Sequence, residues 1–90
     1  MDFDNTFDKN KSEWTKENRG VDFMEARKIW SDSDSISVPA KVIGGETRFL
    51  QIGTLKEKVW TVCYTIRNDQ IRIISVRRAR NEEEEIYRNS

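Results

Sequence analysis

The residues best suited to chemistry are the arginines that crowd the last third of the chain. The stretch IRIISVRRAR, residues 71–80, contains Arg72, Arg77, Arg78 and Arg80. A guanidinium group keeps its charge and offers a planar fork of N–H donors that fits two phosphate oxygens. Placed where a strand meets a helix, such groups could bind a backbone phosphate and stabilise the charge that develops during phosphoryl transfer.

The same arginines also have a purely structural explanation. Four consecutive glutamates, residues 82–85, follow them on a segment with helical character, and surface ion pairs at helical spacing would use the arginine charges without any ligand. Regular alternation along a strand also points Arg72 and Arg77 to opposite faces, so that only a bend would bring them together. The sequence alone leaves both explanations open.

Other polar and aromatic side chains are weaker candidates. Tyr87 lies on the charged C-terminal segment and could donate a proton or stack on a base, and Glu83 could assist proton transfer. Tyr64 and Cys63 lie in an apolar stretch, which predicts core packing for the phenol ring and a buried, unreactive thiol. Trp14 is also expected in the core, although its neighbours are polar. Only Tyr87 and Glu83 therefore join the candidate site.

Composition restricts the classes of protein that this chain can be. Ninety residues, 36 % of them hydrophobic and 36 % charged, predict one domain over residues 1–90 with a small core. A single cysteine and the absence of histidine exclude an intramolecular disulfide and histidine-based triads, and they argue against a zinc site. Neither a signal peptide nor an apolar run of roughly 20 residues is visible. We therefore expect a cytoplasmic protein that needs no metal or cofactor and does not bind a membrane.

The charges are unevenly distributed although the net charge is zero. Residues 46–80 carry eight Lys and Arg against three Asp and Glu, whereas residues 81–90 carry one against four. A neutral total argues against a protein that coats nucleic acids without specificity. The local excess of cations still permits a focused anion site.

Two helices are expected in the first third of the chain. Residues 8–18 contain neither glycine nor proline, and Gly20 can end that helix in the left-handed conformation. Asp22 followed three residues later by Glu25 is a capping box that begins a second helix, which should fade over residues 31–34. The second helix has an apolar stripe made of Phe23, Ala26, Ile29 and Trp30.

Strand signals fill the middle of the chain. Four strands are expected, over residues 36–42, 47–53, 59–66 and 71–76, with turns at 44–45, 54–58 and 67–70. Pro39 restricts the first strand to an edge of the sheet. Short connections predict a mainly antiparallel sheet, and the residues after Val76 predict a C-terminal helix, so the fold class is α+β.

Several segments resemble the BrnT toxins, which are related in fold to the RelE ribonucleases. They are GVDFMEARKIWSD at residues 20–32, RFLQIG at 48–53, VWTVCYTIRNDQIRIISVRRAR at 59–80, and the glutamate–tyrosine segment at 83–87. Asp8 and Lys11 also match the opening motif of that family. The resemblance extends over about residues 5–88. It implies two N-terminal helices, a four-stranded mainly antiparallel sheet and a C-terminal helix, in a RelE-like arrangement.

The resemblance implies a ribonuclease toxin of a type II toxin–antitoxin system, which cleaves RNA and so inhibits translation and growth. A BrnA-like antitoxin with a ribbon-helix-helix domain would neutralise it, and the complex would repress its own operon, with only the antitoxin contacting operator DNA. Cleavage would proceed without metal, by attack of the ribose 2′-hydroxyl on the neighbouring phosphate. The residues assigned to catalysis are Arg72, Arg77, Arg80, Tyr87 and Glu83, and those assigned to RNA binding are Lys11, Arg19, Arg67 and Arg78.

One departure from the family pattern bears on activity. The family typically has a histidine at the position that Arg19 occupies in this chain. The chain is then either an active ribonuclease that works through arginine and lysine, or a degenerate toxin that only binds its antitoxin. A general nucleic-acid-binding protein is a third possibility, which the zero net charge disfavours.

Overall fold

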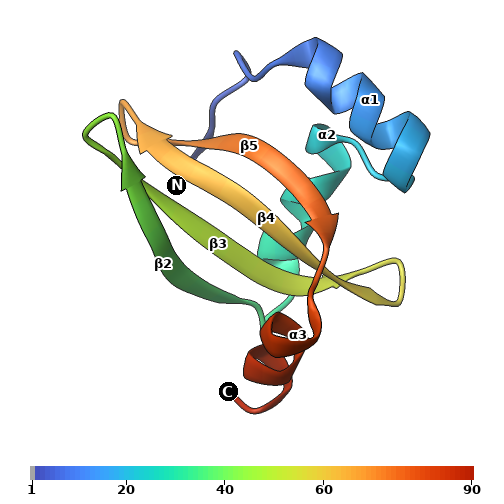
Figure 1. Cartoon of the computed structure of the whole chain (residues 1–90). Coiled ribbons are helices and arrows are strands. Elements are labelled where there is room, and N and C mark those ends of the chain that lie inside the picture. The colour runs from blue at the N-terminus through green and yellow to red at the C-terminus, as the bar shows by residue number, and fades with distance from the viewer. Residues whose placement is uncertain (1) are drawn as a thin grey trace.

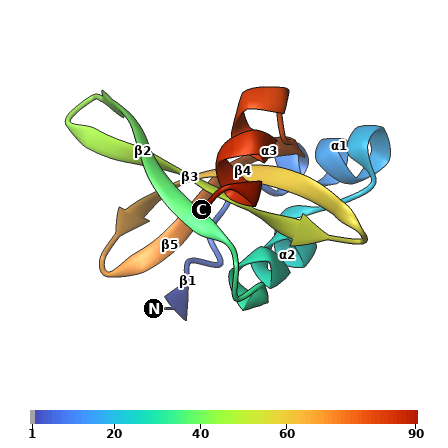
Figure 2. The same ribbon diagram turned by 90° about the horizontal axis from the view of Figure 1, so that it is seen from below.

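The computed structural model describes residues 2–90. They form three layers, with one sheet in the middle and helices on both of its faces (Figure 1). The strands are β1 (Asp2–Phe3), β2 (Ile36–Ile43), β3 (Glu46–Leu55), β4 (Lys58–Arg67) and β5 (Gln70–Arg78). The helices are α1 (Lys9–Arg19), α2 (Phe23–Ala26), the 3₁₀ helix η1 (Arg27–Ser31) and α3 (Asn81–Arg88). Figure 2 shows α2 and α3 on opposite faces of the sheet. The predicted α+β class is thus confirmed.

The two N-terminal helices begin and end where capping chemistry predicts. The Asp8 side chain accepts a hydrogen bond from the Lys11 backbone N–H, and Gly20 ends α1 with φ of +89°. Asp22 and Glu25 form the predicted capping box of α2. The second helix was expected to be one helix. Instead, a single α-helical turn, α2, continues as the 3₁₀ helix η1. No helix within residues 2–90 is long and apolar enough to span a membrane.

The sheet has five strands in the order β1-β5-β4-β3-β2, one more than expected. The additional strand, β1, pairs in parallel with β5, and all other neighbours are antiparallel. The β3–β4 connection is tighter than the predicted turn, because only Lys56 and Glu57 lie between the strands, both with positive φ. β2 is an edge strand as predicted, and its register shifts just after Pro39.

The core lies between the sheet and the N-terminal helices. Phe23, Ala26 and Ile29 are fully buried against the face of the sheet that α2 and η1 cover. Tyr64 is buried as predicted, and its hydroxyl shares a 2.6 Å hydrogen bond with Ser37.

Two predictions of burial were wrong. Trp14 is 51 % exposed, because α1 turns Ser12 and Thr15 toward the core and leaves the opposite side of the helix in solvent. Cys63 is only half-buried, because it projects from the face of β4 that the N-terminal helices do not cover.

Candidate functional site

One face of the sheet, opposite α2, carries most of the polar side chains of the strands. We call it the open face; side chains alternate along a strand and share a face with their cross-strand partners. The side chains that the pairing places there include Arg48, Leu50, Ile52, Thr61, Cys63, Thr65, Arg67, Gln70, Arg72, Ser75 and Arg77. Helix α3 packs against the β3 side of this face and covers one end of it (Figure 2). The other end is not covered by α3.

A β-bulge in β5 brings Arg72 and Arg77 to the same face. Cys63 pairs with Ser75 and Tyr64 pairs with Ile73, so that Ile74 is an extra residue without a partner on β4. The extra residue reverses the alternation, because two positions of one strand then oppose one position of the other. The expectation that the two arginines point to opposite faces is therefore wrong, because a bulge within β5, and not a bend, brings them to the same face.

At the covered end, Arg77 and Glu83 form a bidentate ion pair. The two guanidinium N–H groups donate to the carboxylate at 2.7 and 2.8 Å. Glu83 also accepts from the Thr61 hydroxyl at 3.0 Å and from the Arg80 backbone N–H at 2.8 Å. The Arg77 guanidinium lowers the pKa of Glu83 to about 2. Glu83 is thus an ionised, weakly basic group that ties β5 to the start of α3.

Tyr87 forms the second attachment of α3. Its hydroxyl donates to Asp32 at 2.5 Å and shares a 2.9 Å hydrogen bond with the Thr54 hydroxyl. The Asp32 carboxylate also accepts from the Thr54 backbone N–H at 2.9 Å. The bond to Asp32 raises the pKa of Tyr87 and lowers that of Asp32. The phenol is therefore protonated at neutral pH, and its proton is held by Asp32.

At the uncovered end, the structure has a cationic cavity that we call the basic hollow. It has a volume of about 220 Å³ and is lined by Asp8, Lys11, Arg48, Arg67, Arg72, Ile73 and Ile74. Arg67 is occupied by Glu46 in a bidentate pair at 2.6 and 3.1 Å. Arg72 donates to the Thr6 carbonyl oxygen at 2.8 Å and lies 3.8 Å from an Asp4 carboxylate oxygen. Within residues 2–90, Lys11 and Arg48 form no ion pair.

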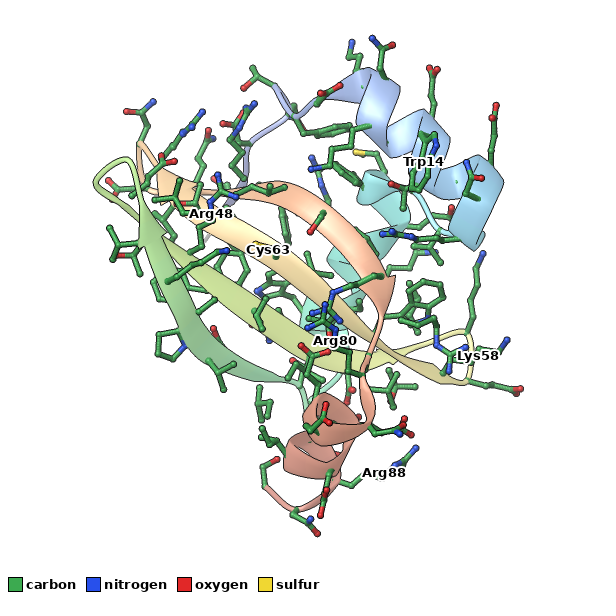
Figure 3. All side chains as sticks on the ribbon, in the orientation of Figure 1. Trp14, Arg48, Lys58, Cys63, Arg80 and Arg88 are labelled. Carbon is green, nitrogen blue, oxygen red and sulfur yellow. The ribbon has the colours of Figure 1, made fainter. Side chains whose placement is uncertain are left out.

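Arg80 is also free to meet a ligand. Its side chain is exposed at the start of α3 and forms no hydrogen bond with another side chain of the part described. Figure 3 shows Arg48, Cys63 and Arg80 along one diagonal in front of the sheet, with Arg80 on the side of α3. The face thus offers cations at both ends and small or uncharged side chains between them.

All three arginines predicted to bind RNA have partners within the chain, and two of them, Arg19 and Arg78, also lie off the open face. Arg19 donates to the Val76 carbonyl oxygen at 2.6 Å and so gives this backbone acceptor of β5 a hydrogen-bond partner. Its guanidinium carbon also lies 5.1 Å from the centre of the Trp14 ring. Arg78 lies on the core side of the sheet, over the Trp60 ring. Neither guanidinium group belongs to the open face.

Sequence reasoning missed Arg48 and Asp32 as parts of this region. Arg48 shares its side of β3 with Leu50 and Ile52, a pattern readable in the sequence. Which side of β3 meets the β5 arginines depends on strand register, and no local signal encodes it. In the sequence, Asp32 belongs to the segment where the second helix was expected to fade. Its role was missed because its partner, Tyr87, lies 55 positions away and leaves no local signal.

Comparison with known proteins complements this geometry. Residues 7–83 match the sequence model of a family described as the ribonuclease toxin, BrnT, of type II toxin-antitoxin systems. No curated protein matches the chain. The matched segment runs from Phe7 through the basic hollow and the bulge to Glu83, so that Tyr87 lies beyond it. Within residues 2–90, no three His, Cys, Asp or Glu side chains cluster as a metal site would require.

Proposed function

The chain belongs to the BrnT family of ribonuclease toxins of type II toxin–antitoxin systems, and from this premise we propose that it cleaves RNA on the open face without a metal ion. One observation carries the proposal. The open face holds Arg72 and Arg77 on the same side of a bulged strand, with Arg48 and the exposed Arg80 at its two ends. Such an array matches the repeated negative charge of an RNA backbone.

The proposed reaction is a transesterification within the RNA. The ribose 2′-oxygen attacks the adjacent phosphorus and loses its proton, while the bond from phosphorus to the 5′-oxygen breaks and that oxygen gains a proton. The products are a 2′,3′-cyclic phosphate and a 5′-hydroxyl. Negative charge builds on the phosphate oxygens in the transition state, and preorganised guanidinium groups stabilise it without reorganising at that moment. We assign this role to Arg80, whereas Arg72 binds the RNA backbone at the other end of the open face.

The contacts favour positioning roles for Arg77, Glu83 and Tyr87. Glu83 accepts from both Arg77 and the Arg80 backbone, so this pair fixes where the Arg80 side chain begins. With a pKa of about 2, Glu83 is a poor acceptor for the 2′-hydroxyl proton. Tyr87 anchors the far end of α3 through Asp32. In this proposal both protons are exchanged with water.

A type II system pairs a toxin with a protein antitoxin, and we propose a BrnA-like antitoxin with a ribbon-helix-helix domain. The antitoxin, and not this chain, would contact operator DNA when the complex represses its own operon. The zero net charge supports this division of labour, because the chain has no overall excess of cations for duplex DNA.

A second candidate function is a toxin homologue that binds its antitoxin and has lost catalysis. It rests on Arg19, which stands at the family's histidine position and is committed to the Val76 carbonyl oxygen and the Trp14 ring. A side chain held in this way stabilises the edge of β5 and cannot act as an acid or base at neutral pH.

The deciding experiment is induced expression in a bacterium, alone and together with the neighbouring gene, using the wild type, Arg72→Ala and Arg80→Ala. We expect growth arrest with RNA degradation for the wild type, relieved by the neighbouring gene, and loss of arrest in both variants. Arg88→Ala is the matched control, because within residues 2–90 Arg88 forms an ion pair with Glu84 alone, on its own helix α3. Normal growth with soluble wild-type protein would support the degenerate toxin instead.

A further inference from the structure

The basic hollow contains an arginine whose hydrogen-bonding capacity is not used. The Nε atom of Arg48 is buried and has no hydrogen-bond partner within residues 2–90. A buried donor without a partner is destabilising, so a group that accepts its hydrogen bond gains binding energy there. Arg27 also has an unpartnered Nε, but its guanidinium group bonds to Asn5 and lies over Phe3 and Phe7, which leaves no room for a ligand role.

The strand register places Arg48 and Arg72 on the same face of the sheet, on either side of β4. Arg48 pairs with Thr65 across β3 and β4, and Thr65 pairs with Arg72 across β4 and β5. The two arginine Cα atoms are therefore two strand spacings apart, about 10 Å. Thr65 between them is 1 % exposed and its hydroxyl donates to the Thr47 carbonyl oxygen, so it offers no donor to a ligand. Both arginines line the basic hollow.

The charge around the basic hollow favours an anion. Arg67 is neutralised by Glu46, whose pKa is lowered first by Arg67 and then by the nearby Arg48 and Arg72. Lys11 and Arg48 form no ion pair in the described chain, and together with Arg72 they outnumber Asp8, the carboxylate that lines the hollow.

We propose that the basic hollow is a phosphate subsite for the RNA strand, separate from the Arg77–Arg80 end, with Arg48 as its anchor and Lys11 and Arg72 as supporting cations. On binding, the Arg48 side chain would turn so that Nε and one terminal nitrogen donate to two oxygens of a single phosphate. The inference rests on the proposed function, and it adds that the RNA lies along β5 and is held at both ends of the open face.

The test is binding of a labelled 2′-O-methyl RNA of about ten nucleotides, a length within the range of single-strand binding sites. This RNA lacks the 2′-hydroxyl needed for cleavage. Its affinity for the purified chain is measured by fluorescence anisotropy over a range of salt concentrations. Arg48→Gln should weaken binding about tenfold and reduce the log–log salt slope by about 0.7, as expected for one lost phosphate contact on a single strand. Arg48→Lys should keep the salt slope of the wild type.

Lys58→Gln is the matched control. It also removes one charge, but Lys58 lies at the β3–β4 turn, at the other end of the molecule (Figure 3). We expect affinity and slope to stay at the wild-type values. Equal losses in Arg48→Gln and Lys58→Gln would overturn the subsite, because they would show attraction to overall charge. Loss of antitoxin binding with unchanged RNA binding in Arg48→Gln would also overturn it, because the hollow would then dock a protein.

A cleavage assay of the wild type on unmodified RNA separates this inference from the proposed function. Cleavage by the wild type together with unchanged RNA binding by Arg48→Gln would contradict only the subsite. Absence of cleavage together with weakened RNA binding by Arg48→Gln would contradict the chemistry and support the subsite. A wild type that neither binds nor cleaves RNA would contradict both.

Discussion

Arg72 and Arg77 project from the same face of β5, because Ile74 between them is the extra residue of a β-bulge. The residues on either side of Ile74 keep regular antiparallel pairing with β4. The bulge is therefore the local feature on which the arrangement of the arginines depends.

Deletion of Ile74 should leave the fold intact. The remaining residues would pair without interruption, with Ile73 and Val76 still facing the core and both arginines still on the open face. We expect a circular dichroism spectrum like that of the wild type and a modest decrease in Tm. Deletion of Val62, in a regular part of β4, is the control; it should unfold the chain, because a one-residue slip moves core side chains to solvent. Unfolding by the Ile74 deletion would show that the bulge itself is required for the fold.

The Arg77–Glu83 pair should make stability depend on pH in acid. The pKa of Glu83 is about 2 in the folded chain, below its ordinary value of 4.5. The pair therefore stabilises the fold fully above pH 4.5, and this contribution is lost as the pH falls toward 2. We expect a contribution of about 1 kcal/mol after allowing for solvent screening. Urea denaturation at pH 7 and pH 3 should show a smaller difference for Glu83→Gln than for the wild type.

Glu25 provides the comparison for that experiment. Lys16 and Lys56 lower its pKa to about 2 as well, but it lies at α2, far in sequence from the candidate site. Glu25→Gln should also flatten the pH dependence while leaving RNA cleavage unchanged. If Glu83→Gln leaves the difference between pH 7 and pH 3 at the wild-type value, the ion pair does not contribute in solution.

Gly53 should not tolerate a side chain. A Cβ atom there would lie 2.7 Å from Ile29 Cγ2 and 2.9 Å from Ser35 Cβ, closer than real contacts allow. Gly53→Ala should therefore destabilise the chain by about 1–3 kcal/mol through overpacking. That corresponds to a decrease in Tm of several degrees or more for a domain of this size. Gly45→Ala is a useful contrast, since within residues 2–90 no atom beyond its two chain neighbours lies within 4 Å of the added Cβ, and its positive φ alone opposes the change.

Tyr87→Phe should loosen α3 without changing the sheet. The substitution removes the hydroxyl that joins Asp32 and Thr54. Apart from the Glu83 contacts at its start, α3 then has no buried residue to hold it on the sheet. We expect faster hydrogen exchange of α3 amides and unchanged exchange in β4. If activity falls while α3 exchange stays at the wild-type rate, Tyr87 acts in proton transfer as the sequence first suggested, and the positioning role is wrong.

Arg19→His should separate the two candidate functions. Histidine cannot reach and bind the Val76 carbonyl oxygen as Arg19 does, so we expect a loss of about 1 kcal/mol in stability. For an arginine-based ribonuclease, the rate of RNA cleavage by this variant should not rise. A gain of cleavage over an inactive wild type would identify Arg19 as the cause of lost catalysis.

Local signals in the sequence predicted most of the elements. Asp22 and Glu25 predicted the start of α2 because capping involves residues only three apart, and Gly20 predicted the end of α1 for a similar reason. Strand β1 escaped prediction, because two residues carry no periodic pattern and their pairing partner lies 68 positions away. The continuation of α2 as η1 was missed too, since both helix types share the same apolar spacing.

The sequence by itself determined the family, the α+β class and the abundance of arginines near the C-terminus, because motifs, periodicity and composition are properties of neighbouring residues. The tertiary structure decided which arginines can act together. It joined Arg72 to Arg48 across β4, removed Arg19 and Arg78 from the open face, and paired Arg77 with Glu83. The reason is physical: a single bulge and the register of three strands set the direction of every side chain on that face, and register is fixed by burial of the whole core rather than by any one segment.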